Sequence, residues 1–307
     1  MNNHEQAQMR ERIRPAFKIK MREEQLADDL EESLLQTYLS VADWVHRQKA
    51  VGKPLLLGVN GAQGSGKSTL CRFLQLILAE AYQYKVIGFS IDDLYLTRAE
   101  RQRLGQEIHP LLVTRGVPGT HDISLGQRIL RALFDPTGKR VALPVFDKAL
   151  DDRRPPAEWP IVDGPADIVI FEGWCVGAKP QAEMELVKPV NGLELEEDPD
   201  GIWRTYVNRQ LQGSYASLFD RIDRLILLKV PSMDCVYQWR SLQEQKLAEK
   251  TASTTYGSHI MDDTAMKRFI MHYERITRHV LAEMPERADL TLSLDHNHQF
   301  TNPDIHP

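Results

Sequence analysis

The sequence predicts an α/β protein in which a central, mostly parallel sheet carries helices on both faces. Short, nearly all-apolar runs, typical of buried parallel strands, alternate with longer segments whose apolar residues recur at helical spacing. The connections between these runs are long enough for the crossovers that parallel strands require. This alternation indicates a three-layer arrangement of helix, sheet and helix.

Five runs are predicted as strands. The first, residues 54–60, leads directly into a glycine-rich loop. The other four cover residues 85–90, 167–171, 224–230 and, with the weakest pattern, 288–294. Helical patterns cover residues 30–45, 69–82, 124–134, 206–219, 233–250 and 263–283.

The chain is predicted to form one domain, residues 31–307, preceded by a polar extension at residues 1–30. Within this extension, residues 1–28 have no clear helical period and are expected to be mobile or weakly helical. The helix that starts at residue 30 is expected to dock on this domain. Two segments, near residues 135–166 and 178–203, are predicted to be irregular insertions, the first with six prolines and the second acidic. Long connections of this kind are uncommon in compact domains and are often functional.

Composition narrows the class of partner. The 307 residues are 42% hydrophobic and 26% charged, with a net charge of −5, so no nucleic acid or anionic membrane is expected as a partner. The three cysteines form no CxxC pair, which argues against a disulfide framework or a zinc site. No secretory signal or membrane span is expected, so we expect a cytoplasmic protein. The sequence does not specify an oligomeric state.

The loop after the first strand fits the phosphate-binding pattern G-x-x-x-x-G-K-[ST]. Its position between a buried strand and an amphipathic helix is the context that this pattern requires. Backbone N–H groups and the helix N-terminus bind phosphates there, and the lysine reaches the outer phosphates. The predicted fold is therefore a P-loop NTPase that binds ATP. The predicted ATP-binding loop residues are Gly61, Ala62, Gln63, Gly64, Ser65, Gly66, Lys67, Ser68 and Thr69.

A second acidic group is expected to help hold Mg²⁺. Glu172 ends the apolar run 167–171, and Gly173 permits a sharp exit from the strand. With the hydroxyl of Ser68, this carboxylate is predicted to bind the metal directly or through water. The alternative is an ordinary solvated strand end.

The second strand ends in Ser-Ile-Asp-Asp-Leu-Tyr at residues 90–95, where ligands of open α/β sheets collect. Asp92 is predicted to be the catalytic base, acting with Lys67, and Asp93 is the second candidate for the base. Asp93 is otherwise expected to contact the substrate or to cap the next helix. Tyr95 is expected to line the acceptor pocket or to pack.

A basic set of residues within this acidic chain favours a small anionic acceptor. It lies in stretches with no predicted strand or helix and consists of Arg115, His121, Lys148, Arg153 and Arg154. The alternative for Arg154 is a surface ion pair with Asp151 or Asp152. The alternative for His121 is that it only starts the helix that follows. Arg240 is predicted to reach the γ-phosphate from a lid formed by helix 233–250 and a flexible stretch 251–258. Trp174 is predicted to pack.

Several longer motifs in this sequence resemble those of a known family of kinases. The motif at 90–95 and the Glu172-Gly173 strand end resemble those of the phosphoribulokinase/uridine kinase group. Within that group the chain resembles the D-glycerate 3-kinase family of plants, fungi and bacteria, from about residue 30 to 285. The matching stretches are 115–122, 143–148 through 153–154, 171–174, Asn208 and 239–240.

The resemblance implies that ATP is the donor and the 3-hydroxyl of D-glycerate the acceptor, with Mg²⁺ as cofactor. Two alternatives stay open. The acceptor can be another small hydroxyl metabolite, such as a sugar, a nucleoside or a pantothenate-like compound. In a protein of another class, the loop would instead hydrolyse ATP to control the binding of a partner.

Overall fold

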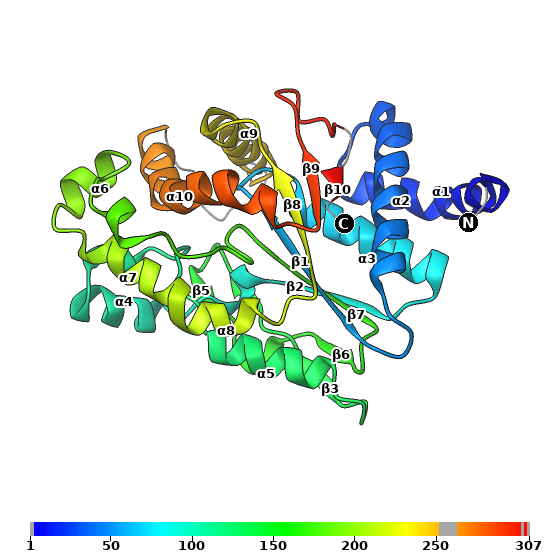
Figure 1. Cartoon of the computed structure of the whole chain (residues 1–307), viewed down its shortest axis with the longest axis horizontal. Helices are drawn as coiled ribbons and strands as arrows, with labels where there is room; N and C mark the ends of the chain where they lie inside the picture. Colours follow the sequence, from blue (N-terminus) through cyan, green and yellow to red (C-terminus); the bar gives the residue numbers. More distant parts are fainter. Residues whose placement is uncertain (1–2, 252–262, 302–303, 306–307) are drawn as a thin grey trace.

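The chain folds around a six-stranded sheet with helices on both faces (Figure 1), which confirms the predicted three-layer α/β fold. The computed structural model describes residues 3–251, 263–301 and 304–305. The strand order is β10-β9-β8-β1-β7-β2. All neighbouring pairs are parallel except β10 with β9, so the sheet is mostly parallel as expected.

The five predicted strands all occur, with bounds that differ from the prediction by at most two residues. They are β1 (Leu55–Gly61), β2 (Val86–Ser90), β7 (Ile168–Gly173), β8 (Arg224–Lys229) and β9 (Leu290–Ser293), and β10 (Asp304–Ile305) adds the edge. The main helices are α1 (Asn3–Glu23), α2 (Glu31–Gln48), α3 (Lys67–Tyr82), α4 (Arg98–Glu107), α5 (Ile123–Leu133), α9 (Met233–Thr251) and α10 (Asp263–Glu283). The predicted helix 206–219 is divided into α7 (Ile202–Gln210), a π-helical turn (Leu211–Tyr215) and α8 (Ala216–Phe219).

The sheet separates two hydrophobic cores. Leu55, Leu57 and Val59 of β1 face helices α1, α2 and α3, whereas Leu56 belongs to the core on the other face, with α5, α7, α8 and α10. Figure 1 shows these two groups of helices on opposite sides of the sheet. Because β1 is buried on both faces, its sequence is almost continuously apolar.

The N-terminal extension is more regular than its sequence indicates. Residues 3–23 form α1, and Ile13, Phe17 and Met21, spaced four residues apart on one face, are buried against α2 and α3. Of the two expectations for this segment, mobile or weakly helical, the helical one is closer to the structure. The helical period is hard to recognise in the sequence because only one apolar residue per turn marks the buried face. Pro15 in the middle of the helix further obscures the pattern.

Both segments predicted to be irregular contain short regular elements. In residues 135–166, β3 (Arg140–Ala142) pairs with β6 (Ile161–Asp163), and β4 (Phe146–Asp147) pairs with β5 (Asp152–Arg153). Residues 178–203 contain α6 (Gly192–Glu197) and the start of α7. Strands of two or three residues and a helix of six are too short for apolar periodicity to reveal them. Within the described ranges, no helix is both long and apolar enough to cross a membrane.

We expect Phe17→Ala to lower the free energy of unfolding by about 3–5 kcal/mol. The Phe17 ring is fully buried, with its centroid 4.5 Å from that of Phe73 on α3, so truncation leaves a cavity between α1 and the core. Urea denaturation followed by circular dichroism measures the loss. Ile19→Ala, at a side chain that is 58% exposed on the same helix, is the control and should change stability by less than about 1 kcal/mol. Equal effects of the two substitutions would show that α1 does not dock through Phe17.

Candidate active site

A cavity of about 770 Å³ opens at the carboxyl ends of β1, β7 and β2. The parallel register places Val59 beside Glu172 and Ser90 on the other side of Glu172, so the three strands end at nearly the same level. Loops that leave these ends therefore converge on one space. The cavity wall includes Gln63, Gly64, Lys67 and Ser68 from the glycine-rich loop and the start of α3.

The glycine-rich loop turns directly from β1 into α3. Gly64 and Gly66 have φ angles of +77° and +85°, a region that side chains disfavour, so glycine is required for the turn. A Cβ atom on Gly64 would also lie 3.0 Å from Cβ of Trp239. Among the described residues no side chain caps the N-terminus of α3, so its first N–H groups remain available for an anion.

Ser68 and Glu172 meet on this side of the sheet. The Ser68 hydroxyl donates to Oε1 of Glu172 at 2.8 Å. Oε2 of Glu172 is buried and has no hydrogen-bond partner in the described part of the chain. A buried carboxylate oxygen with a lone pair to spare, next to a hydroxyl, fits a Mg²⁺ ion. Mg²⁺ at phosphate sites uses one or two protein ligands together with phosphate oxygens and water.

Asp92 lies in the short turn after β2 and is held by two donors. Lys148 Nζ donates to Oδ2 at 2.9 Å, and the Tyr95 hydroxyl donates to Oδ1 at 2.9 Å. Burial disfavours the charge, but the Lys148 ammonium and the Tyr95 hydroxyl together hold the pKa of Asp92 well below its usual range. The Asp92 charge in turn raises the pKa of Lys148. Both groups are therefore charged at neutral pH, and both line the cavity.

Asp93 differs from its neighbour. Its Oδ1 accepts a hydrogen bond from the backbone N–H of Phe146 at 3.3 Å, which ties β4 to the turn after β2. Burial raises the pKa of Asp93 to about 6, and the nearby Asp92 charge adds to this, although the Phe146 N–H opposes it. Asp92 is the carboxylate that stays ionised over a wide pH range, while Asp93 titrates near neutrality.

Of the residues predicted to bind the substrate, Tyr95 and Arg115 also line the cavity. The Tyr95 ring stacks on His121, with centroids 4.5 Å apart, and meets Phe146 edge-on. Arg115 pairs with Asp151 through Nη1, and its guanidinium lies 5.4 Å from the centroid of the Phe146 ring. The sequence left open whether Tyr95 lines the pocket or packs. In the structure it does both.

His121 and Arg153 are not on the cavity wall, in contrast to the prediction that they contact the substrate. His121 is buried behind Tyr95, where its Nδ1 lies 2.6 Å from the Tyr215 hydroxyl. Burial lowers the pKa of His121 to about 3, so the ring is neutral and supplies no positive charge. Arg153 points instead to Asp122, with Nη1 and Oδ2 3.5 Å apart.

Arg240 on α9 does line the cavity. Its guanidinium carbon lies 5.6 Å from the centroid of the Phe269 ring on α10, a distance typical of a cation–π contact. This position lies beside the glycine-rich loop, since Gly64 is close to the backbone of Trp239 and Arg240. The stretch 252–258 that the sequence assigns to the lid lies outside the described residues.

No family model matches the chain. An uncharacterised kinase of Schizosaccharomyces pombe is 33% identical over 232 residues, which span 73% of this chain and 80% of the relative. The chloroplastic D-glycerate 3-kinase of Arabidopsis thaliana is 30% identical over 245 residues, which span 77% of this chain but only 50% of that relative. A solved structure of the D-glycerate 3-kinase from Cryptococcus neoformans has a TM-score of 0.73 at 26% identity, with 88% of this chain and 99% of that chain covered.

This chain belongs to the D-glycerate 3-kinase family of P-loop kinases. It is accordingly an ATP-dependent phosphotransferase that uses an alcohol group as acceptor. The glycine-rich loop and the start of α3 form one side of its cavity, and the turn after β2 forms another.

Four aromatic residues of this kinase line the cavity without having been assigned to it from the sequence: Phe89, Trp174, Phe269 and Tyr273. Trp174 does pack as predicted, because its ring meets Tyr273 edge-on and its Nε1 donates to the Gly116 carbonyl at 3.0 Å. Its position directly after Glu172-Gly173 was a signal for a place in the site. Phe269 and Tyr273 follow no strand and belong to no motif, so the sequence offered no comparable signal for them.

The raised pKa of Asp93 predicts a specific pH dependence. Because its folded pKa of about 6 exceeds the ordinary 3.8, the folded protein holds this proton more tightly than the unfolded chain does. The resulting stabilisation is complete below about pH 4 and is lost as the pH rises through about 6. Asp93→Asn keeps an acceptor for the Phe146 N–H and removes the titration. We expect its free energy of unfolding to gain about 1–2 kcal/mol relative to wild type between pH 4 and pH 7.5, measured by urea denaturation at each pH. A constant difference between the two proteins would contradict the raised pKa.

Proposed function

We propose that this kinase transfers the γ-phosphoryl group of ATP to the 3-hydroxyl of D-glycerate, giving ADP and 3-phosphoglycerate. One observation supports this most directly. The ionised Asp92, paired with Lys148 at 2.9 Å, shares a cavity with Lys67 of the phosphate loop and with Arg115. A hydroxy acid kinase needs a carboxylate that orients the attacking hydroxyl, a site for the phosphates of ATP, and cations that bind the carboxylate of the substrate.

The donor half of the reaction is assigned to the loop. Its N–H groups and Lys67 bind the β- and γ-phosphates, and Arg240 approaches the same phosphates from α9. Ser68 and Oε2 of Glu172 would hold Mg²⁺, which neutralises phosphate charge when it is bound. The Lys67 ammonium forms no hydrogen bond or ion pair among the described residues, which leaves its three donors for the nucleotide.

The acceptor half is assigned to the turn after β2 and the β4–β5 segment. Asp92 accepts the hydrogen bond of the attacking hydroxyl and directs its lone pair toward phosphorus. Lys148 has donors beyond the one that it gives to Asp92, and only Nη1 of Arg115 is paired within the described ranges. These remaining donors would bind the glycerate carboxylate.

The aromatic lining does not favour a nucleoside acceptor. Nucleosides are commonly held between open ring faces, but Tyr95, Trp174 and Tyr273 are each only 3% exposed. Tyr95 stacks on His121, and Trp174 and Tyr273 meet edge to face. Phe269 has its ring next to Arg240. The open parts of the acceptor region are therefore mainly charged, which suits a small anion.

Acceptor dependence tests the proposed function. ADP release, measured in a coupled assay, is expected to rise strongly on addition of D-glycerate, with 3-phosphoglycerate formed in equal amount. Sugars, nucleosides and pantothenate serve as competing acceptors. Equal rates with and without every acceptor would instead indicate an ATPase that controls a partner.

Asp92→Asn is expected to lower kcat by about 10²–10⁴-fold, because the amide cannot accept the hydroxyl proton. The Kd for ATP, from titration calorimetry, should change by less than about threefold, since the phosphates are held by the separate loop. Asp163→Asn, at a 75% exposed side chain at the end of β6, is the control and should keep wild-type kcat. An undiminished kcat in Asp92→Asn would make Asp93 the remaining candidate base.

Glu172→Gln tests the metal assignment. Glutamine still accepts from Ser68 but carries no charge, so the Mg²⁺ concentration for half-maximal rate should rise about tenfold. Titration of Mg²⁺ at fixed ATP and D-glycerate measures this shift, and excess chelator should abolish turnover in both proteins. An unchanged Mg²⁺ dependence would assign the metal to other groups.

A further inference from the structure

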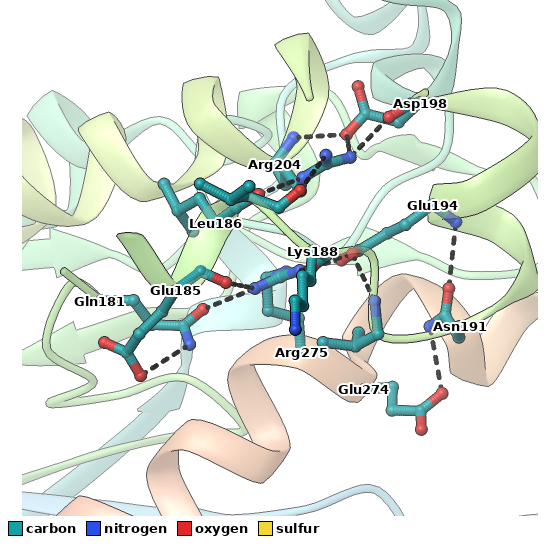
Figure 2. Close-up of polar contacts among 12 residues, drawn as sticks. Gln181, Glu185, Leu186, Lys188, Asn191, Glu194, Asp198, Arg204, Glu274 and Arg275 are labelled. Carbon is teal, nitrogen blue, oxygen red and sulfur yellow. Dashed lines mark hydrogen bonds and ion pairs between the residues drawn. The ribbon is translucent and has the colours of Figure 1, made fainter. Parts of the chain in front are cut away.

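None of the residues of the insertion 178–203 lines the cavity. The insertion packs instead on the outer side of α10. Figure 2 shows its polar residues directed at α10 and at α7. The inner side of α10 carries Phe269 and Tyr273, which do line the cavity. One helix thus joins the insertion to the acceptor region.

Arg275 makes the main connection from α10. Its Nε donates to Oε1 of Glu194 and its Nη2 to Oε2, each at 2.7 Å. Nη2 also donates to the Lys188 carbonyl at 2.6 Å, and Nη1 to the Glu185 carbonyl at 3.0 Å. The side chains of Glu194 and Arg275 are 0% and 6% exposed, so this pair is buried inside the molecule.

A second buried arginine holds the same stretch of backbone from α7. Arg204 Nε donates to the Leu186 carbonyl at 2.6 Å, and Nη1 pairs with Oδ2 of Asp198 at 3.0 Å. The carbonyls of residues 185–188 are therefore shared between two guanidinium groups on two different helices. We call Arg204, Asp198, Glu194 and Arg275 the arginine clamp (Figure 2).

Asn191 extends the connection along α10. Its Oδ1 accepts from the backbone N–H of Glu194 at the start of α6, while its Nδ2 donates to the Met271 carbonyl at 2.9 Å and to Glu274 at 3.0 Å. Met271 lies between Phe269 and Tyr273 in the sequence. The insertion thus contacts α10 within the same turns that face the cavity.

Directional contacts of this kind fix the position of a helix more than they stabilise it. A buried ion pair gains little net free energy, because desolvation of both charges offsets their attraction. The bidentate fork and the carbonyl contacts nevertheless allow only one rotation and one axial position of α10. On its inner side, the Tyr273 hydroxyl donates to the Arg115 carbonyl at 3.1 Å, and its ring meets Trp174. A rotation of α10 would therefore displace Tyr273 and the backbone of Arg115.

We propose that Glu194 and Arg275 of the arginine clamp are positioning residues. They hold α10 so that its Phe269 and Tyr273 stay in place at the acceptor side of the cavity. This inference rests on the proposed function for its kinetic part only. None of the four clamp residues lines the cavity. The clamp acts through α10 on the geometry around Arg115.

The test compares Glu194→Gln with Glu197→Gln. Glu197 forms a bidentate pair with Arg268, also between α6 and α10, but the two side chains are 42% and 47% exposed. In Glu194→Gln, hydrogen exchange of the 266–276 backbone should be at least tenfold faster, and KM for D-glycerate should rise about tenfold. KM for ATP should change by less than threefold, because the phosphate loop is held separately. Glu197→Gln should match wild type in all three measurements.

Arg275→Lys gives a graded second variant if Glu194→Gln fails to fold. It keeps the charge and one contact to Glu194 but loses the fork, so its exchange rate and acceptor KM should lie between those of wild type and Glu194→Gln. Unchanged exchange and acceptor KM in both variants would overturn the proposal, as would equal increases in both KM values. A wild-type protein that does not phosphorylate D-glycerate would refute the proposed function alone, because the exchange measurement still decides whether the clamp holds α10.

Discussion

The active site depends on the level at which three parallel strands end. β1, β7 and β2 are hydrogen-bonded in register, so that Glu172 lies between Val59 and Ser90. This alignment brings the glycine-rich loop, the Glu172 carboxylate and the Asp92 turn into one cavity. A shift of one residue in the pairing of β7 would turn the Glu172 side chain toward the opposite face of the sheet, away from Ser68. The apolar cores on both faces fix this register, because each strand must bury side chains on both sides.

Charge pairing within the cavity explains how a chain with net charge −5 can bind anions. Each cation on the acceptor side already has an acidic partner, Asp92 for Lys148 and Asp151 for Arg115. The partners keep the cations ordered when no anion is bound, and they occupy only some of the donors. Asp92 gains from the same pairing, because Lys148 keeps it ionised despite burial. The partly buried Asp92 carboxylate and the more exposed Lys148 ammonium thus stabilise each other's charge in the cavity.

The sequence predicted the parts of the site that follow strand ends. Glu172 and Asp92 come at or just after the end of an apolar run, and Lys67 ends the glycine-rich loop that follows another such run. This local pattern is enough to place the three near one another. It did not separate Lys148 and Arg115, which reach the cavity, from His121 and Arg153, which do not. All four lie in segments without apolar periodicity, where the direction of a side chain depends on tertiary contacts. The sequence indicated α1 only as one of two alternatives, mobile or weakly helical, for a related reason: its buried face has only one apolar residue per turn.

The two insertions contribute to the site at different distances. Residues 135–166 supply Lys148, which contacts Asp92 in the cavity. The hydrogen bond from the Phe146 N–H to Asp93 fixes the start of the β4–β5 segment beside the Asp92 turn. Residues 178–203 supply no cavity residue, yet their buried charges are the most completely hydrogen-bonded contacts of α10. Buried charge is an inefficient way to gain stability but an effective way to fix orientation. In the sequence, this insertion looked like an irregular acidic segment. Its polar residues fit the role proposed for it, which is to orient α10, a helix that forms no hydrogen bonds with the strands in the described part of the chain.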